Sequence, residues 1–406
     1  MKIAMMTNNY LPFIGGVPIS IQRLGEGLRR QGHEVVVFAP AYREQEKGDM
    51  AKDNVIRYHS FIKGIVNGAS VPNSFDRRIE REFAKGEFDV IHVHHPMMIG
   101  WTAVYLSRKY NVPLVLTYHT RYEQYLHYIK ASGFKDIVPV YMRKYMKFCD
   151  MILTPTPLMK DYLEQIGVKE QIQVLPTGIS DDNFQVDKER SAMLRRQFLG
   201  DENAQERKYL FCTVARLAKE KNLKFLFHVL SRRKKAKAAS DFCLVLVGEG
   251  PEEKRLRKLA QELDLEKEIH FAGRVPNEEI KNYCHASDLF LFSSLSETQG
   301  IVLLEAMAAA TPVLAVRATG VSDIVINGVN GYMTSASEKE FEQTLDTVLS
   351  NPLHELKKGA LDTAAGYRTQ DIAARAVYDY KIAAAAHGYA GVQYESYSGK
   401  PPCLFS

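Results

Sequence analysis

The chain contains no long apolar run. None of its segments approaches the roughly 18 consecutive apolar residues that a membrane-spanning helix requires. The beginning of the chain turns polar at Thr7, too early for the apolar core of a signal peptide. The sequence therefore predicts no membrane span and a cytoplasmic protein.

Cysteine is scarce and shows no pattern. The 5 cysteines are widely spaced, with no Cys-x-x-Cys pair, and no histidines cluster at metal-ligand spacing. An odd number without a repeat is typical of reduced thiols rather than of a disulfide framework. Most of these cysteines are therefore interpreted as small core residues.

A large net charge is also absent. The formal net charge is +5, and residues 1–180 carry the surplus, with 23 Lys and Arg against 17 Asp and Glu. A basic first half is compatible with an anionic lipid surface, with nucleic acid, or with an ordinary solvated surface. Of these partners, we expect no nucleic acid.

What the chain does contain is an alternation of short apolar runs and helical or loop stretches, which occurs twice. The runs lie at 3–6, 34–38, 90–93, 114–117 and 151–154, and again at 210–214, 243–247, 269–271, 289–292 and 312–316. Short continuous apolar strands between helices are typical of a parallel sheet that helices cover on both faces. The pattern predicts an α/β fold of two Rossmann-like, doubly wound domains.

The polar stretch 181–208 separates the two patterns and is interpreted as a linker plus a surface helix. We therefore expect one domain over 1–180 and a second over 181–369. An Ala-rich helix around 370–390 is expected to pack back on the first domain, and 391–406 form a tail of unassigned role. Ligands of such sheets bind beyond the carboxyl ends of the strands, so the chemistry is expected in a central cleft between the domains.

The most informative segment follows the expected strand 289–292. A polar loop leads into a helix that begins near Gly300, with Glu297 just before it and Glu305 about two turns inside. Backbone N–H groups and the helix dipole favour diphosphate at such a helix start, and glycine permits close approach. The two carboxylates would repel phosphate and are interpreted as acceptors for sugar and ribose hydroxyl groups. The alternative is a helix cap at Glu297 and a surface residue at Glu305.

Glu297-x7-Glu305, followed by Ala-Met-Ala, resembles the signature of family 4 retaining glycosyltransferases, which have the GT-B fold. The resemblance implies that Glu297 contacts the donor sugar and that Glu305 binds the ribose. It also implies that the amides of Gly300, Ile301 and Val302 hold sugar hydroxyls and the diphosphate.

A second landmark lies upstream, after the expected strand 210–214. Residues 214–222 are similar to the family's Gly-Arg-Leu…Glu-Lys segment, with Ala215 in place of the usual glycine. The resemblance implies that Arg216 and Lys221 neutralise the diphosphate, whose departure requires cationic stabilisation. Taken alone, two such cations would indicate only a solvated helix start.

Loops at Gly250 and Arg274 correspond to family loops that border the nucleotide, and the backbone near Arg274 would contact the base. Gly16 follows the first strand, where GT-B enzymes place a glycine loop against the diphosphate. The chain lacks Gly-x-Gly-x-x-Gly at this point, which disfavours a nicotinamide or flavin cofactor. His119, after the strand 114–117, corresponds to a family histidine that supports the oxocarbenium-like transition state. A lone histidine at a strand end is otherwise more often structural.

The chain also lacks an Asp-x-Asp pair, which GT-A enzymes use to hold a metal on the diphosphate. We therefore expect no obligatory metal and no cofactor besides the UDP-sugar substrate. Arg216, Lys221 and the helix start would stabilise the leaving group, with Glu297 and His119 beside the reacting sugar. The resemblance implies front-face displacement with retention of the anomeric configuration.

The segment 118–128 resembles that of bacterial diacylglycerol glucosyltransferases and, more loosely, of sulfoquinovosyl-lipid synthases. The resemblance implies a lipid acceptor, with Tyr122 and Tyr125 at the level of the headgroup. We accordingly expect a protein that can lie peripherally on the inner face of the cell membrane.

A helix at 140–148 combines aromatic residues with Arg143, Lys144 and Lys147, which suits an anionic membrane surface. The alternative is that this helix packs its Tyr and Met face into the first domain. A further basic run, 232–235, is interpreted as a solvated helix end.

The leading hypothesis is a retaining transferase that moves glucose from a UDP-sugar to diacylglycerol. The same chemistry on a soluble or polyprenyl-linked acceptor is one alternative. A sugar-nucleotide epimerase of the same fold is another, although the sequence reveals no acid or base groups poised for elimination. A sugar-binding module without catalysis is disfavoured by the intact set Glu297, Glu305, Arg216, Lys221 and His119.

Overall fold

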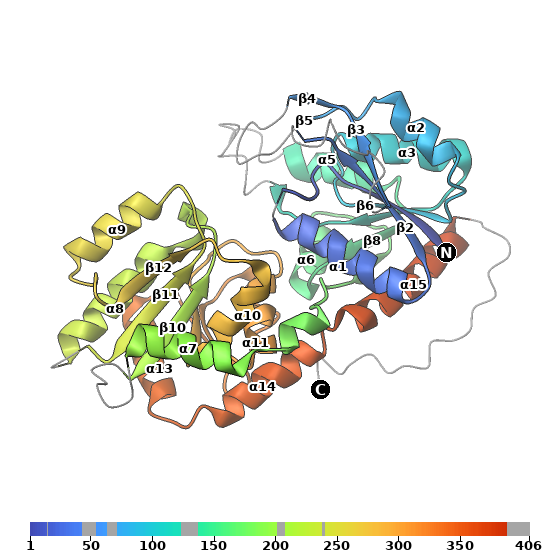
Figure 1. Ribbon diagram of the computed structural model, residues 1–406. Coiled ribbons are helices and arrows are strands. Elements are labelled where there is room, and N and C mark those ends of the chain that lie inside the picture. The colour runs from blue at the N-terminus through green and yellow to red at the C-terminus, as the bar shows by residue number, and fades with distance from the viewer. Residues whose placement is uncertain are drawn as a thin grey trace. The chain divides into compact units, whose positions relative to one another are not determined.

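The computed structural model describes residues 1–13, 15–42, 54–62, 71–122, 137–200, 208–237 and 240–387. These residues form two compact units (Figure 1). Unit 1 combines the described residues up to Gly178 with those from Thr369 onward, and unit 2 is Ile179–Arg368. The chain therefore leaves unit 1 at Gly178 and returns to it at Thr369.

Unit 1 is built on a parallel sheet of seven strands in the order β3-β2-β1-β6-β7-β8-β9. These strands are β1 (Lys2–Met6), β2 (Glu34–Pro40), β3 (Val55–Tyr58), β6 (Val90–Val93), β7 (Leu114–Thr117), β8 (Met151–Thr154) and β9 (Ile172–Val174). A short antiparallel pair, β4 (Ser60–Ile62) with β5 (Val71–Pro72), lies apart from this sheet. The order changes direction between β1 and β6, as in doubly wound folds.

Helices cover both faces of this sheet. They are α1 (Gly16–Arg30), α2 (Arg77–Ala84), α3 (Ile99–Tyr110), α5 (Ile137–Met146), α6 (Pro157–Gln165) and α15 (Thr369–Ala386). Successive side chains of β1 enter different cores, since Ile3 and Met5 pack with α1 and α15 while Ala4 and Met6 pack with the other four helices. This alternation is the two-residue period of a strand buried on both faces.

Helix α15 packs tightly on α1 within unit 1. A Cβ atom at Gly27 of α1 would lie 2.8 Å from Cβ of Ala373 and 2.9 Å from the backbone oxygen of Thr369. Only glycine permits this approach of the two helices. Leu28 of α1 and Ile372 of α15 belong to the same buried cluster.

Unit 2 holds a second parallel sheet, of six strands in the order β12-β11-β10-β13-β14-β15. The strands are β10 (Tyr209–Val214), β11 (Phe242–Val247), β12 (Ile269–Gly273), β13 (Leu289–Phe292), β14 (Val313–Val316) and β15 (Gly331–Thr334). The prediction of two Rossmann-like domains is therefore confirmed.

Helices and helical turns surround this second sheet. They are η5 (Asp181–Phe184), α7 (Lys188–Leu199), η7 (Lys219–Lys221), α8 (Leu223–Ala236), α9 (Glu253–Glu262), α10 (Asn277–Ala286), α11 (Ile301–Ala308), α12 (Thr319–Ser322), α13 (Glu338–Leu349) and α14 (His354–Ala365). The strands and α8, α9 and α13 share one buried cluster. Helix α7, in the stretch expected to hold a surface helix, packs on α10 through a face that buries Leu194 and Leu199.

The interpretation of 232–235 as a solvated helix end is wrong for Arg233, whose side chain is 1% exposed. Its guanidinium lies 2.9 Å from Oδ2 of Asp241 and also pairs with Asp346. A buried guanidinium is stable only when carboxylates replace its hydration. This pairing could not be predicted from local sequence, since Asp346 lies 113 residues further along the chain.

Candidate functional site

The residues predicted to bind a nucleotide sugar gather at one edge of the sheet in unit 2, namely the edge that the carboxyl ends of its strands form. Arg216 follows β10, Gly250 follows β11, Arg274 follows β12 and Glu297 follows β13. These four strands are consecutive in the parallel sheet, so their carboxyl ends lie at the same edge. The strand order changes direction at β10 and β13, which is where doubly wound sheets bind ligands.

A cation and a carboxylate pair at this edge. Nζ of Lys221, in the turn η7, lies 2.5 Å from Oε1 of Glu297, with exposed side-chain fractions of 22% and 16%. Ser293 Oγ donates to the backbone oxygen of Lys221 at 2.9 Å, and Ser294 Oγ donates to that of Glu220 at 3.2 Å. The end of β13 thus holds the turn η7 in place, although the two segments lie more than 70 residues apart.

The loop after β11 packs directly on the loop that carries Arg216. The backbone N–H of Leu217 donates to the oxygen of Glu249 at 2.9 Å. A Cβ atom at Gly250 would lie 2.3 Å from the backbone oxygen of Leu217, and one at Gly248 would lie 2.1 Å from that of Ala215. Both glycines are therefore required by the packing of the two loops.

The start of α11 carries no side-chain cap. Gly300 occupies the N-cap position in the left-handed region, with φ of 68° and ψ of 48°, which glycine adopts without strain. The alternative interpretation of Glu297 as a helix cap is wrong, because its carboxylate pairs with Lys221. Half-buried Ile301 and Val302 begin the helix, and half-buried Glu305 follows in its second turn. The side chains of Arg216 and Arg274, in contrast, are exposed to solvent.

Gly16 opens helix α1 in unit 1 and is exposed. A Cβ atom added to it would meet no described protein atom within 4 Å. Packing of the described residues therefore does not require glycine at this position, in contrast to Gly250.

Histidines gather at the carboxyl ends of β6 and β7 in unit 1. His119, after β7, is 8% exposed, and its Nε2 lies 2.9 Å from Nδ1 of the fully buried His94, after β6. His92 lies beside this pair, with its Nε2 2.6 Å from Oγ1 of Thr117 and its Nδ1 2.7 Å from the hydroxyl of Tyr380. The ring centroids of His92 and His94 are 4.2 Å apart.

Burial decides the charge of these rings. It lowers the pKa of His92 to about 3 and that of His95 to about 4. Burial, followed by the neighbouring histidines, holds the pKa of His94 and of His119 well below the usual range. All four rings are therefore neutral at pH 7.

Sequence reasoning predicted His119 and missed its neighbours. The signal was the run His92-Val93-His94-His95 at the end of an apolar strand. Since β6 and β7 are adjacent in the parallel sheet, histidines after both strands meet at one edge.

The residues predicted to face acceptor or membrane lie on different parts of unit 1. Tyr122 is half-buried, with its ring centroid 6.0 Å from that of Tyr118, and burial raises its pKa. Tyr125 lies outside the described residues. Exposed basic side chains project from α5 and the turn after it, at Arg143, Lys144 and Lys147.

The interpretation that helix α5 packs its Tyr and Met face into the first domain is confirmed, whereas the membrane role of its basic residues stays a prediction. Its face with Met142, Tyr145 and Met146 is buried in unit 1, while its basic residues stay exposed. Within the described ranges, no helix is long and apolar enough to cross a membrane. The same ranges contain no group of three or more His, Cys, Asp or Glu side chains arranged to hold a metal ion.

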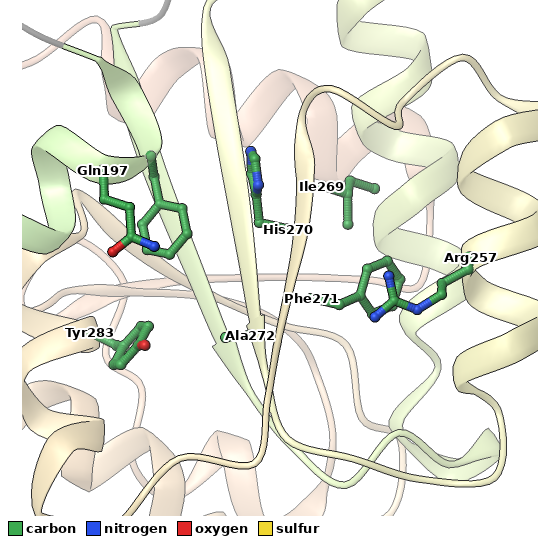
Figure 2. A pocket seen from close by; sticks show the side chains of 8 residues that line it. Gln197, Arg257, Ile269, His270, Phe271, Ala272 and Tyr283 are labelled. Atoms are coloured by element: carbon green, nitrogen blue, oxygen red, sulfur yellow. The ribbon is translucent and has the colours of Figure 1, made fainter.

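A separate pocket of about 490 Å³ lies along the edge strand β12 of unit 2 (Figure 2). His270 projects from this strand on the side of Gln197 and Tyr283, whereas Phe271 projects toward Arg257. The guanidinium carbon of Arg257 lies 4.2 Å from the ring centroid of Phe271. None of the predicted donor-binding residues lines this pocket.

The class of protein follows from the two sheets and from solved structures that share them. HepE of Anabaena in complex with UDP superposes with a TM-score of 0.75, covering 94% of this chain and 100% of that chain at 18% identity. A likeness at that identity shows the fold, which is the GT-B fold of two parallel-sheet Rossmann-like domains.

Family comparisons cover both units. The family described as Glycosyltransferase Family 4 matches residues 14–183, and the one described as Glycosyl transferases group 1 matches residues 195–363. The chain belongs to the family 4 glycosyltransferases, as its motifs predicted.

Two curated relatives match most of the chain. The alpha-monoglucosyldiacylglycerol synthase of Streptococcus pneumoniae is 31% identical over 334 residues, which are 78% of this chain and 71% of that protein. The protein of the same name from Acholeplasma laidlawii is 30% identical over 371 residues, which are 87% of this chain and 89% of that protein.

Proposed function

We propose that this glycosyltransferase moves glucose from UDP-glucose to a membrane lipid such as diacylglycerol, with retention of the anomeric configuration. The observation that carries the proposal is the pair Lys221–Glu297, held at 2.5 Å beside the uncapped start of α11. The names of the two curated relatives support the sugar and the lipid acceptor.

The pair Lys221–Glu297 suits a ligand that carries both phosphate and hydroxyl groups. In the structure, the ammonium of Lys221 and the carboxylate of Glu297 pair with each other. When a sugar diphosphate enters, the ammonium exchanges the carboxylate for phosphate oxygens, and the carboxylate accepts hydrogen bonds from sugar hydroxyls. A site built for phosphate alone would not place a carboxylate beside its lysine, because the two anions repel.

The other proposed contacts with the nucleotide sugar come from residues at the same edge of the unit 2 sheet. Arg216 binds the diphosphate together with Lys221, and the N–H groups at Gly300, Ile301 and Val302 bind phosphate and sugar oxygens. Glu305, in the second turn of α11, accepts hydrogen bonds from the ribose hydroxyls. The loops at Gly250 and Arg274 border the base and the ribose.

The transfer step requires no covalent enzyme intermediate. The bond between the anomeric carbon and the phosphate oxygen breaks, and the acceptor hydroxyl oxygen bonds to the same face of the sugar. The departing phosphate oxygen takes the acceptor proton, so UDP and the glycoside are the products. Arg216, Lys221 and the start of α11 stabilise the charge on the leaving group, and we propose that no metal is needed.

His119 contributes from unit 1 as a neutral ring. An imidazolium beside an oxocarbenium-like sugar would raise the energy of the transition state by charge repulsion. Burial lowers the pKa of His119 well below the usual range, which removes this repulsion at neutral pH. A Cβ atom at Gly16 of the same unit would meet no atom of the described residues within 4 Å, which is compatible with a ligand close to this position.

A lipid acceptor requires a surface that meets the bilayer, and helices α3 and α5 offer one. They lie side by side, because Nε1 of Trp101 donates to the hydroxyl of Tyr141 at 2.9 Å. Trp101 is 43% exposed and Val140 is 40% exposed. These apolar groups, with the exposed Arg143, Lys144 and Lys147, form a mixed surface that suits the interface of an anionic membrane.

The acceptor is tested by turnover with UDP-glucose and either diacylglycerol in anionic vesicles or soluble and polyprenyl-linked acceptors. We expect a lipid-linked α-glucoside, identified by the proton coupling of its anomeric centre. A β-linked product, or turnover confined to soluble acceptors, would contradict the proposal. Free epimerised sugar formed without acceptor would instead identify an epimerase.

The membrane surface is tested by flotation of the protein with vesicles. Lys144→Ala should weaken binding to anionic vesicles by about 1 kcal/mol, because one basic residue near the surface contributes about that much. Lys237→Ala, in unit 2, serves as the control and should bind as the wild type does. Equal losses for both variants would contradict the assignment of this surface.

A further inference from the structure

The two histidines at the edge of the unit 1 sheet share one hydrogen bond. Nδ1 of His94 lies 2.9 Å from Nε2 of His119, and the two rings meet edge to edge and nearly coplanar, with an interplanar angle of 24° and centroids 5.2 Å apart. One nitrogen must donate a proton and the other must accept it, because both rings are neutral. The bond therefore selects one tautomer for each ring.

His94 is held rigidly on its other side. Its backbone N–H donates to the oxygen of Met6 at 2.9 Å, which fixes it at the end of β6. Its ring also lies against that of His92, whose two nitrogens form hydrogen bonds with the hydroxyl groups of Thr117 and Tyr380. The ring of His94 thus lies between the ring of His92, which two hydrogen bonds hold in place, and the ring of His119.

The direction of the shared bond follows from the second nitrogen of His94. Its Nε2 is buried and has no hydrogen-bond partner within the described part of the chain. Buried N–H groups without an acceptor are rarer than buried acceptors without a donor. Nε2 therefore carries no proton, and the proton of His94 lies on Nδ1, from which it is donated to Nε2 of His119.

The same reasoning then fixes His119. Since its Nε2 accepts, a neutral His119 carries its proton on Nδ1. Among the contacts of the described residues, Nδ1 of His119 has no hydrogen bond of its own. His119 consequently offers an N–H donor, and no basic nitrogen, to a group that approaches Nδ1.

We propose that His94 is a positioning residue, which locks His119 in the tautomer that donates a hydrogen bond from Nδ1 to the transferred sugar. The target of this bond rests on the proposed function, whereas the tautomer does not. In this arrangement His119 cannot take the proton of the acceptor hydroxyl. That proton leaves with the phosphate oxygen of UDP.

The tautomer is tested directly by nitrogen NMR on the whole protein, labelled with ¹⁵N in histidine. His119→Gln, which lacks the ring, identifies the signals of His119 by their loss. We expect a protonated Nδ1 and an unprotonated Nε2 for His119 in the wild type. A protonated Nε2 would overturn the proposal, whatever the protein transfers.

Two substitutions of His94 test its role. The side-chain amide of His94→Asn can keep an N–H donor near the position of Nδ1, whereas His94→Leu has similar volume and no donor. For His94→Leu we expect kcat to fall between about 10-fold and 100-fold, with KM for the donor within about twofold, as for a loss of alignment alone. His94→Asn should recover most of this loss.

Equal losses in the two variants would contradict a role for the N–H of His94. Should His94→Leu fail to fold, the NMR signature of the wild type still decides the proposal. Failure of the proposed function would appear differently, as absence of UDP-glucose turnover in a wild type whose His119 has the expected tautomer. The two failures are therefore distinguishable.

Discussion

The carboxyl edges of the two sheets are built in opposite ways. The edge in unit 2 pairs the cation Lys221 with the carboxylate Glu297 and carries the exposed Arg216 nearby. The edge in unit 1 gathers His94 and His119, whose burial holds them neutral. One Rossmann-like scaffold thus supports a charged site and an uncharged one, and the side chains at the strand ends decide which.

This contrast suits the charges that develop during sugar transfer. The leaving diphosphate gains negative charge and needs cations, whereas the sugar gains positive charge and would be repelled by an imidazolium. We therefore expect substitutions at the two edges to impair different steps. Substitutions at the edge in unit 2 should weaken nucleotide binding, and substitutions at the edge in unit 1 should slow turnover.

The largest effect is expected for Lys221→Ala. It removes a cation from the diphosphate and leaves Glu297 unpaired beside it, so kcat/KM for UDP-glucose should fall by roughly 10²–10³-fold. Lys219→Ala, an exposed lysine of the same turn, is the matched control and should stay near the wild type. Steady-state kinetics of both variants provides the comparison, and equal activities would remove Lys221 from the site.

A somewhat smaller loss is expected for His119→Ala. The substitution should lower kcat by roughly 10–100-fold while the dissociation constant of UDP stays unchanged, because the proposed contact of His119 is with the transferred sugar and not with the nucleotide. Single-turnover kinetics and calorimetric titration with UDP measure the two quantities. Weakened UDP binding with normal kcat would reverse the assigned roles of the two edges.

Glu305→Ala should weaken the binding of UDP and leave kcat unchanged. Loss of hydrogen bonds between the carboxylate and the ribose should weaken UDP binding by about 1.5–3 kcal/mol, the range for hydrogen bonds to charged groups. Titration with UDP and with free uracil separates ribose contacts from base contacts. An unchanged affinity for UDP would show that Glu305 does not bind the ribose.

The smallest effect is expected from chelation. If Arg216, Lys221 and the start of α11 stabilise the leaving group, EDTA should leave the rate of transfer nearly unchanged. The measurement is turnover before and after dialysis against EDTA, with a Mg²⁺ readdition control. Abolished activity that Mg²⁺ restores would contradict a metal-independent mechanism.

The central strands of both sheets were predictable from the sequence, and several edge strands were not. Runs such as Leu289–Phe292 are apolar throughout because helices cover both of their faces. The edge strands β3, β9 and β15 were missed, since they are short and mix apolar with polar or small residues. Edge strands are less buried, so their sequences carry a weaker apolar signal.

The predicted site shows a similar limit. Motifs placed Arg216, Lys221, Glu297 and Gly300 at strand ends that the structure brings to one edge. The ion pair Lys221–Glu297 could not be predicted, because its partners lie 76 residues apart. The pair His94–His119 was missed for the same reason, since sheet order, and no local spacing, brings two strand ends together.

A crystal structure with UDP-glucose bound tests the central claim most directly. We predict that the diphosphate lies against Nζ of Lys221, the guanidinium of Arg216 and the N–H groups at the start of α11, with Glu297 turned to the glucose hydroxyls. Nucleotide bound elsewhere, such as in the pocket along β12, with the pair Lys221–Glu297 intact, would contradict the account.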